Sequence, residues 1–394
     1  MFDKVKSLID TVCRAVIRDW LGEGRPKNRP SARRRKLEVE VLEGREVPAS
    51  LWTGAIDGDW GRAGNWTVNG VVPVNAPGII GADNEVKIDT VAGGKSYPTI
   101  SAGQSYEIAK LSTLSGFASY VFQINGSLTI KGTGTSSFFV EQISLSSNGV
   151  LDIQTNFDWG SQDGFSGGTV KVDGGGVMTV KQDAQKLGSS LIVGGPSSGT
   201  VTLANMTNNL EFLTNGSITV KAQGLLDFAQ TTDSDTAGGI ASGTAGGILS
   251  IQGGVVTRSG VSGEVLQIGT AILVDNGGGY IGKFVVEKGS NVKVTTTATG
   301  PSIGVLHGWV VLDPNTLLVA PSGVELNSST SKLRVMGWDG AGNNTVFLDG
   351  SLDVQDGTVE IAYGANHPLH RFHHPGRLHD GRWDARHGHQ GGNE

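Results

Sequence analysis

A short pattern of polar and apolar positions recurs along most of the chain after residue 100. Each copy begins with Gly and one further residue, usually small or polar, and ends in two aliphatic residues separated by one residue. This alternation predicts a strand with one buried face and one exposed face. The copies occupy residues 126–130, 149–153, 168–172, 176–180, 199–203, 216–220, 247–251, 350–354 and 357–361.

The spacing of these copies predicts the architecture. They begin 23 and 19 residues apart at 126, 149 and 168, and 23 and 17 apart at 176, 199 and 216, with a wider step of 31 to 247. Sandwiches built from hairpins have a turn about every 8–12 residues, whereas a repeat of about 20 is typical of one coil of a parallel β-helix. No part of residues 101–363 predicts a crossover helix, which excludes a βαβ fold.

The fold class that follows is all-β, a parallel β-helix or solenoid, with a right-handed coil expected. In it the aliphatic residues point inward and stack on their equivalents in the neighbouring coils, while Thr, Ser, Lys and Asp point outward. The repeated Gly residues are expected at corners, where their freedom of backbone conformation is useful. We expect β-helix repeats over residues 101–363, preceded by a cap and the first coils over 49–100.

Composition narrows the function classes. Gly accounts for 61 of 394 residues and charged residues for 17%, against about 25% in an average protein. Residues 49–363 hold fifteen Lys/Arg against twenty-six Asp/Glu. Such an acidic body is a poor surface for nucleic acid, which requires clustered cations, and for anionic lipid. Cys13 is the single cysteine, so no disulfide framework is expected, and no apolar run predicts a transmembrane helix.

Residues 1–48 differ from the body in charge and pattern, with twelve Lys/Arg against eight Asp/Glu. Their apolar residues recur at three- and four-residue spacing, which predicts a short amphipathic helix. By itself this pattern fits either a surface helix or a targeting segment, and the basic run after it fits either a linker or a solvated charged stretch. The apolar positions are Phe2, Val5, Leu8, Ile9, Val12, Val16 and Trp20.

The segment 31–49 reads Ser-Ala-Arg-Arg-Arg-Lys-Leu-Glu-Val-Glu-Val-Leu-Glu-Gly-Arg-Glu-Val-Pro-Ala, and Leu51-Trp52-Thr53-Gly54 follow it. This segment resembles the N-terminal signature of large planctomycete secreted and surface proteins, in which a basic stretch leads into Leu-Glu-x-Arg-x-x-Pro-Ala before a repetitive β-rich body. Gly44 departs from the acidic or polar residue that is usual there. The resemblance implies export, so residues 1–48 are expected to be a basic export and linker segment.

Three tryptophans, Trp52, Trp60 and Trp66, fall within fifteen residues at the start of the body. The segments around Trp52 and Trp66 are similar to the opening of secreted β-helix and autotransporter-like passenger proteins. A solenoid needs its first coil covered, because the end of its core would otherwise be open to water. Large aromatic rings suit this purpose and predict a cap, although such a group of rings also suits stacking on sugars.

Three short segments resemble catalytic or cofactor-binding motifs, but none is followed by the helix that its motif requires. Ser197 lies in a Gly-x-Ser-x-Gly string, but another strand pattern follows where a nucleophile elbow requires a helix. Residues 277–282 fit Gly-x-Gly-x-x-Gly, and residues 94–96 resemble part of a phosphate loop, but neither opens a helix. We expect residues 277–282 to be a turn and assign no chemistry to the other two segments.

Carbohydrate-active β-helix enzymes are the serious alternative. Their hydrolases need paired carboxylates, and no Asp-Asp dipeptide occurs; His387-Gly388-His389 is the nearest approach to a Gly-His-Gly string. Arg258 and Arg334 have no acidic cluster close in sequence, as a lyase would require. Asp57 with Asp59, and Asp233 with Asp235, suit either a Ca²⁺ site or solvated turns, which we favour. We therefore assign no catalytic, cofactor-binding or metal-ligating residue and expect no enzyme activity.

The last 31 residues, 364–394, break the pattern. Seven of the eight His lie between His367 and His389, and from Asn366 onward there is no Val, Ile, Thr or Ser. Three interpretations compete: a flexible metal-chelating tract, a disordered tail without a role, or an out-of-frame reading of a gene whose coils continue. We favour the last, on which the complete protein is longer.

The expected function is that of a non-enzymatic extracellular or cell-surface β-helix, serving as a stalk, coat or adhesin-like component. Its partners would be glycans or other cell-surface proteins, with no nucleic acid and no cofactor. The alternatives are a polysaccharide lyase or glycoside hydrolase whose site is dispersed in sequence, and an intracellular scaffold. The ligand and the oligomeric state stay open.

Overall fold

The computed structural model describes most of the body, in ranges separated by short gaps. They are residues 48–78, 85–88, 96–113, 121–138, 142–160, 164–180, 186–203, 210–213, 216–228, 240–241, 248–258, 265–268, 270–277, 279–288, 290–294, 300–336, 346–362, 370–372 and 376–378. The predicted N-terminal helix and all but the last residue of the export segment lie outside them, as do Asp233, Asp235 and Lys95.

One sheet, called sheet A here, takes one strand from each coil. It begins with β1 (Ser50–Trp52), which pairs antiparallel with β2 (Trp66–Val68) and parallel with β3 (Glu85–Ile88). All the following pairings up to β34 are parallel and in sequence order. These strands are β6 (Lys110–Thr113), β9 (Thr135–Phe138), β12 (Asn156–Trp159), β14 (Gly176–Val180), β16 (Gly199–Leu203), β19 (Gly224–Asp227), β22 (Val255–Arg258), β25 (Gly282–Val286), β28 (Gly308–Leu312), β31 (Lys332–Met336) and β34 (Thr358–Ala362).

The other sheet, sheet B, contains two parallel columns of strands. In two coils the columns join, in β13 (Phe165–Val172), which is bulged between Ser166 and Thr169, and in β15 (Lys186–Val193). The first column also contains β4 (Thr99–Ile100), β7 (Val121–Ile124), β10 (Gln142–Leu145), β17 (Leu210–Phe212), β20 (Ile240–Ala241), β23 (Val265–Ile268), β26 (Asn291–Val294), β29 (Thr316–Val319) and β32 (Val346–Asp349).

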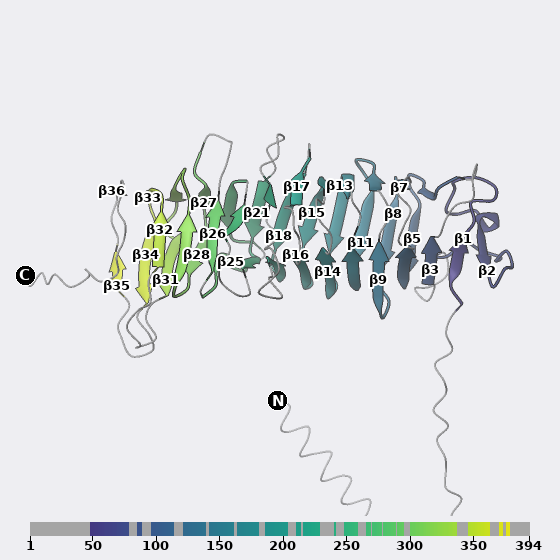
Figure 1. Ribbon diagram of the computed structural model, residues 1–394, viewed down its shortest axis with the longest axis horizontal. Helices are drawn as coiled ribbons and strands as arrows, with labels where there is room; N and C mark the ends of the chain where they lie inside the picture. Colours follow the sequence, from purple (N-terminus) through teal and green to yellow (C-terminus); the bar gives the residue numbers. More distant parts are fainter. Residues whose placement is uncertain are drawn as a thin grey trace, which may run out of the picture. The chain divides into compact units, whose positions relative to one another are not determined.

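The second column of sheet B follows the first in every coil. Its strands are β5 (Ser105–Ile108), β8 (Ser127–Ile130), β11 (Val150–Ile153), β18 (Ser217–Lys221), β21 (Ile248–Gln252), β24 (Ile272–Asp275), β27 (Ile303–Val305), β30 (Val324–Leu326) and β33 (Leu352–Val354). The chain therefore passes from sheet A to the first and then the second column of sheet B, and returns to sheet A one strand further on (Figure 1). This is a parallel β-solenoid, as predicted; the handedness stays a prediction.

The interior is built from columns of apolar side chains that repeat from coil to coil. Alternation within each strand turns every second residue inward, and the parallel register places equivalent residues above one another. One such column is at most 1% exposed throughout: Leu128, Leu151, Val170, Leu191, Ile218, Leu249, Ile272, Ile303 and Val324. Burial of each such side chain stabilises the fold by roughly 1.5–3 kcal/mol before entropic costs.

Most coils are longer than the predicted repeat of about 20, and their length varies, as the uneven spacing of the copies indicated. Val150 pairs with Thr169, 19 positions later, but Ser217 pairs with Ile248, 31 positions later. The prediction was too short because the glycine pattern occurs on two faces of a coil. Gly199 pairs with Gly224 on sheet A, whereas the copy at 216–220 lies on sheet B, so the 17-residue step between them crosses from one face to another.

Two of the glycines in the repeated pattern meet the predicted need for backbone freedom, since Gly168 and Gly350 have positive φ, but others have a different reason. Gly149 and Gly199 do not have positive φ. A Cβ at Gly199 would lie 1.8 Å from the carbonyl oxygen of Val172, and one at Gly149 would lie 2.1 Å from that of Ile124. Close approach of one coil's backbone to the next therefore excludes a side chain here.

The three clustered tryptophans cover the start of the core. Trp52, Trp60 and Trp66 are 0–2% exposed, so none presents a ring face to a sugar. Trp66 packs edge-on against Trp52 at 4.8 Å and against Trp60 at 4.7 Å between ring centroids. Trp60 stacks at 5.5 Å on Phe122, which lies in the first column of sheet B. Such packing is what covering the first coil requires.

A buried asparagine holds the loop of this cap. Asn65 ends the 3₁₀ helix η1 (Ala63–Asn65) and is 0% exposed. Its Oδ1 accepts hydrogen bonds from the backbone N–H groups of Ile56 and Asp57, and its Nδ2 donates to Asp57 Oδ1 and to the Asp59 carbonyl. Each polar atom of this buried amide is thereby satisfied, as burial demands.

Two short strands follow β34 within the predicted tail. Strand β35 (His370–Phe372) pairs antiparallel with β34, and β36 (Gly376–Leu378) pairs antiparallel with β33. The tail residues 364–394 are therefore not without structure at these two segments. The other tail residues lie outside the described ranges, where disorder, metal chelation and an altered reading frame stay predictions.

The close approach at Gly199 leads to a stability prediction. Gly199→Ala should lower the free energy of unfolding by about 1–3 kcal/mol, because the added methyl group forces the two coils apart. Gly304→Ala is the matched control, since its Cβ would meet no atom closer than 3.6 Å. Urea denaturation followed by circular dichroism measures both; equal midpoints for the two variants would contradict this reason for the glycines.

Candidate binding surface

A partly exposed tryptophan lies on the outer face of sheet A. Phe284, Val310 and Leu333 point into the core, so alternation turns Lys283, Trp309 and Lys332 outward on three successive strands. The parallel register places Trp309 between the two lysines, since Lys283 pairs with Trp309 and Trp309 with Lys332. Arg334, two residues after Lys332, points outward on the same strand.

Three cationic groups converge on this indole. The Nζ atoms of Lys283 and Lys332 lie 5.2 and 5.3 Å from the Trp309 ring centroid, and the guanidinium carbon of Arg334 lies 5.0 Å from it. Cations within about 6 Å of an aromatic ring are attracted by its quadrupole, by about 0.5–1 kcal/mol each at exposed sites. We call Lys283, Trp309, Lys332 and Arg334 the Trp309 cluster.

Glu360 fixes two members of the cluster. Its carboxylate oxygens lie 2.7 Å from Lys332 Nζ and 3.1 Å from Arg334 Nε, and the residue is 2% exposed. Burial shields these ion pairs from solvent screening. Lys283 has no ion-pair partner among the described residues, so the three cations retain an excess of positive charge over the single carboxylate.

The face around the cluster is less polar than predicted. Val285 and Val311, which precede Arg334 in an outward column of sheet A, are both only partly exposed. Val255 and Leu225 point outward in the coils before Lys283. The prediction that Thr, Ser, Lys and Asp make up the exterior is therefore wrong for this face, where aliphatic residues lie beside the indole.

Two carboxyl groups of neighbouring coils lie where strands in the second column of sheet B end. Asp173 lies directly after β13, and its pKa is raised, first by burial and then by the charge of Asp152 in β11. Gln154 Nε2 donates to Asp152 Oδ2 at 2.8 Å.

A histidine–aspartate pair occupies the same corner several coils later. His307 follows β27, and its Nδ1 lies 3.0 Å from Oδ1 of Asp275, the last residue of β24. The Asn276 N–H donates to the same carboxylate oxygen at 2.8 Å. A carboxylate that holds one imidazole nitrogen leaves the other available for proton transfer, which is the arrangement of a general base.

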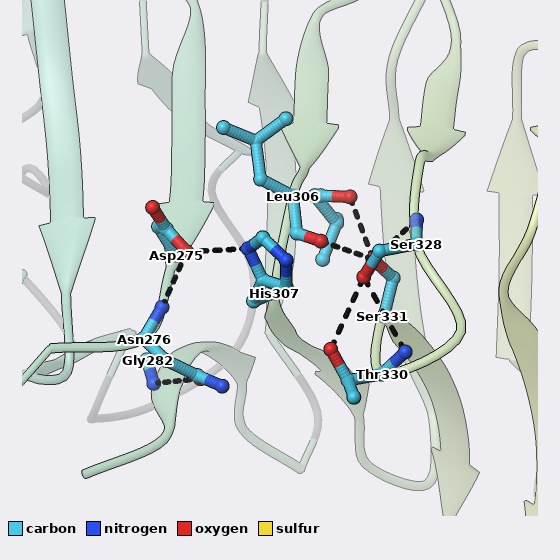
Figure 2. A network of polar contacts seen from close by, with 9 residues as sticks. Asp275, Asn276, Gly282, Leu306, His307, Ser328, Thr330 and Ser331 are labelled. Atoms are coloured by element: carbon cyan, nitrogen blue, oxygen red, sulfur yellow. Dashed lines mark hydrogen bonds and ion pairs between the residues drawn. The ribbon is translucent and has the colours of Figure 1, made fainter. Parts of the chain in front are cut away.

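The nearby hydroxyl groups do not complete a catalytic triad. Ser331 Oγ donates to the carbonyls of Val305 and Leu306 at 2.8 and 2.9 Å, and the residue is 0% exposed. Figure 2 shows Ser331 turned to these carbonyls, while His307 lies beside Asp275. Asp275 is the one side chain in the described ranges that hydrogen-bonds the His307 ring.

The candidates singled out in the sequence have structural surroundings. Ser197 Oγ accepts a hydrogen bond from the backbone N–H of Gly174, and strand β16 follows it. Gly277 and Tyr280 exchange two backbone hydrogen bonds, which confirms the turn predicted there.

Asp57 and Asp59 belong to the cap. The pKa of Asp57 is lowered, first by the hydrogen bond from Asn65, then by the backbone N–H of Asp59 and by the charge of Arg62, which lies 2.8 Å away. Asp59 Oδ1 accepts a hydrogen bond from the Gly61 N–H. No group of three or more potential metal ligands occurs among the residues that the structure describes.

Sequence reasoning missed all three surface clusters, because their members are far apart in the chain. Lys283 and Trp309 are 26 positions apart, and Asp275 and His307 are 32 apart. Arg334 has no acidic neighbour in sequence but meets Glu360 across the register of β31 and β34. The sequence identifies such neighbours only when the number of residues between each pair of stacked strands is known.

The described residues thus define a parallel β-solenoid with a covered first coil and a cationic aromatic cluster on one face. Comparison of the chain with protein families, curated proteins and solved structures finds no match. Over the described ranges, no helix has the length and apolar character needed to span a membrane.

The Asp152–Asp173 pair predicts a pH-dependent stability difference. A folded-state pKa above that of the unfolded chain contributes stability at low pH that is lost as pH rises through the folded value. Asp173→Asn, which stays neutral, should therefore be more stable than wild type at about pH 7, with a smaller advantage at about pH 4.

Urea midpoints at the two pH values measure this difference, with Asp356→Asn, an exposed carboxyl on another coil, as the control. A difference between Asp173→Asn and wild type that does not change with pH would contradict the raised pKa of Asp173.

Proposed function

We propose that this protein is an exported, non-enzymatic β-solenoid that acts at the cell surface as a stalk, coat or adhesin-like component and binds glycans. The observation that carries the proposal is the Trp309 cluster, which offers a partly exposed indole and cationic groups on a sheet face held rigid by stacked coils. Aromatic rings and polar groups in fixed positions are what flat polysaccharide chains require of a binding surface.

The surroundings of the reactive side chains also support a binding role. Ser331 and Ser197 use their hydroxyl oxygens in hydrogen bonds to the backbone. Asn65 and Asp57 are committed to the cap loop. In each case the side chain that suggests chemistry stabilises a turn or loop of the backbone.

Export to the envelope or beyond is part of the proposal and rests on the signature at residues 31–49. The solenoid fits that location, because its stability comes from burial along the stack and needs no disulfide.

A carbohydrate-active enzyme is the second candidate, favoured by two specific contacts. The Asp152–Asp173 pair contains a carboxyl with a raised pKa, and Asp275 orients His307. Proton transfer by either group would suit a lyase or a hydrolase. The Asp275–His307 pair contains one carboxylate, whereas a glycoside hydrolase uses two.

Binding without turnover is the expected behaviour of the full chain. Affinity gel electrophoresis should show retardation by at least one polymer among polygalacturonate, dextran sulfate, dextran and soluble cellulose derivatives. Assays of new reducing ends and of ultraviolet absorbance by unsaturated uronates should show no product. Product that increases with protein concentration and disappears in Asp173→Asn or His307→Gln would establish the enzyme instead, and retardation by none of the polymers would contradict glycan binding.

The export segment can be tested separately. Residues 1–48 fused to a periplasmic or extracellular reporter enzyme should direct the reporter out of the cytoplasm, whereas the same fusion with the Arg33, Arg34 and Arg35 run replaced by Gln should export less. Full retention of both fusions in the cytoplasm would favour an intracellular scaffold.

A further inference from the structure

We infer that the Trp309 cluster is a binding site for an acidic sugar unit, one bearing a carboxylate or a sulfate ester, within a polysaccharide. This inference rests on the proposed function and specifies its ligand class. Nothing in the sequence pattern singles out Trp309, Lys283, Lys332 and Arg334; the parallel register of β25, β28 and β31 brings them together.

The charge of the site selects an anion. Three cationic groups lie within 5.0–5.3 Å of one indole ring, and Glu360 is the one carboxylate that an ion pair ties to them within the described ranges. Residues 49–363 hold fifteen Lys/Arg and twenty-six Asp/Glu, so the cluster is a local positive site in an acidic body. A polyanion would be repelled elsewhere and attracted here.

The cationic groups are already positioned. Glu360 is buried and holds Lys332 and Arg334 beside the indole. Lys283 lies on the preceding strand, β25, and is attracted to the same indole ring. Side chains that are held before binding lose less conformational freedom when the ligand arrives. Arg334 also brings several N–H donors in a planar group, which suits carboxylate and sulfate oxygens.

The apolar part of the site favours a sugar over a simple ion. Val285 and Val311 lie partly exposed on the same face as Trp309, in the column that leads to Arg334. The three strands lie about 4.8 Å apart, so the cationic groups span about 10 Å. An acidic saccharide has C–H groups that can contact Val285 and Val311, and anionic groups that can bind the cationic side chains.

Nucleic acid fits this site less well. Binding to a phosphate backbone depends on many cations along an extended track, and only four residues make up this cluster. The acidic body around it opposes a long polyanion of high charge density. A single-stranded oligonucleotide is therefore included as a probe whose binding would count against the inference.

The test compares variants of the full chain for binding to polygalacturonate, dextran sulfate, uncharged dextran and an oligo-dT strand, by affinity gel electrophoresis and isothermal titration calorimetry. Trp309→Ala and the double variant Lys283→Gln/Arg334→Gln should each weaken binding to the acidic polymer by about tenfold or more. Trp309→Phe keeps an aromatic ring and should weaken it by less than about threefold. Comparing carboxylated with sulfated polymer identifies the preferred anion.

Lys293→Gln is the matched control, because Lys293 is a partly exposed lysine in a strand of sheet B. It removes the same charge from another face and should leave affinity unchanged within about twofold. Unchanged urea midpoints show that the variants remain folded.

The possible failures are distinguishable. Retardation by an acidic polymer that the Trp309 and Lys283/Arg334 variants do not weaken overturns this site and leaves the proposed glycan-binding function standing. Binding to uncharged dextran alone also overturns the acidic ligand while retaining that function. Binding to oligo-dT that is as tight as to the acidic polysaccharides, and equally weakened by the variants, replaces the sugar with a phosphate polymer. Absence of binding to every polysaccharide removes both proposals.

Discussion

The stacking of each coil on the next is the interaction on which every other feature of this protein depends. A single coil has two or three strands and cannot enclose its own apolar side chains. Hydrogen bonds between parallel strands and columns such as Leu151, Val170 and Leu191 form only between coils. Each coil therefore derives its stability from its neighbours, and the ends of the stack need a cover of their own.

The two ends of the described stack meet this need in different ways. At the start, Trp52, Trp60 and Trp66 pack against one another and against Phe122, with Asn65 satisfying the backbone of the loop between them. After the last parallel strands, β35 and β36 reverse direction and pair antiparallel with β34 and β33. Antiparallel strands at either end stop the parallel pairing and occupy an edge that would otherwise be free to add strands.

The same stacking creates the surface chemistry. A parallel register aligns one outward residue per coil, so side chains separated by a whole coil become neighbours about 4.8 Å apart on a rigid face. This is how Trp309 comes to lie between Lys283 and Lys332, and how Asp275 meets His307. Variation in coil length leaves these contacts unaffected, because additional residues are taken up between strands and the pairing of the strands is maintained.

Local pattern in the sequence was sufficient to predict the strands, the inward residues within each strand, the solenoid class and the aromatic cover, because these follow from the two-residue period of a single strand and from where apolar side chains avoid water. The stacking of the copies was decided only by the tertiary structure. Gly199 pairs with Gly224 rather than with the copy at 216, and Gly149 is required by a carbonyl of the preceding coil. Register depends on the length of each intervening segment and on hydrogen bonds between residues 19 to 31 positions apart, which no local pattern encodes. The Trp309 cluster is a product of that register.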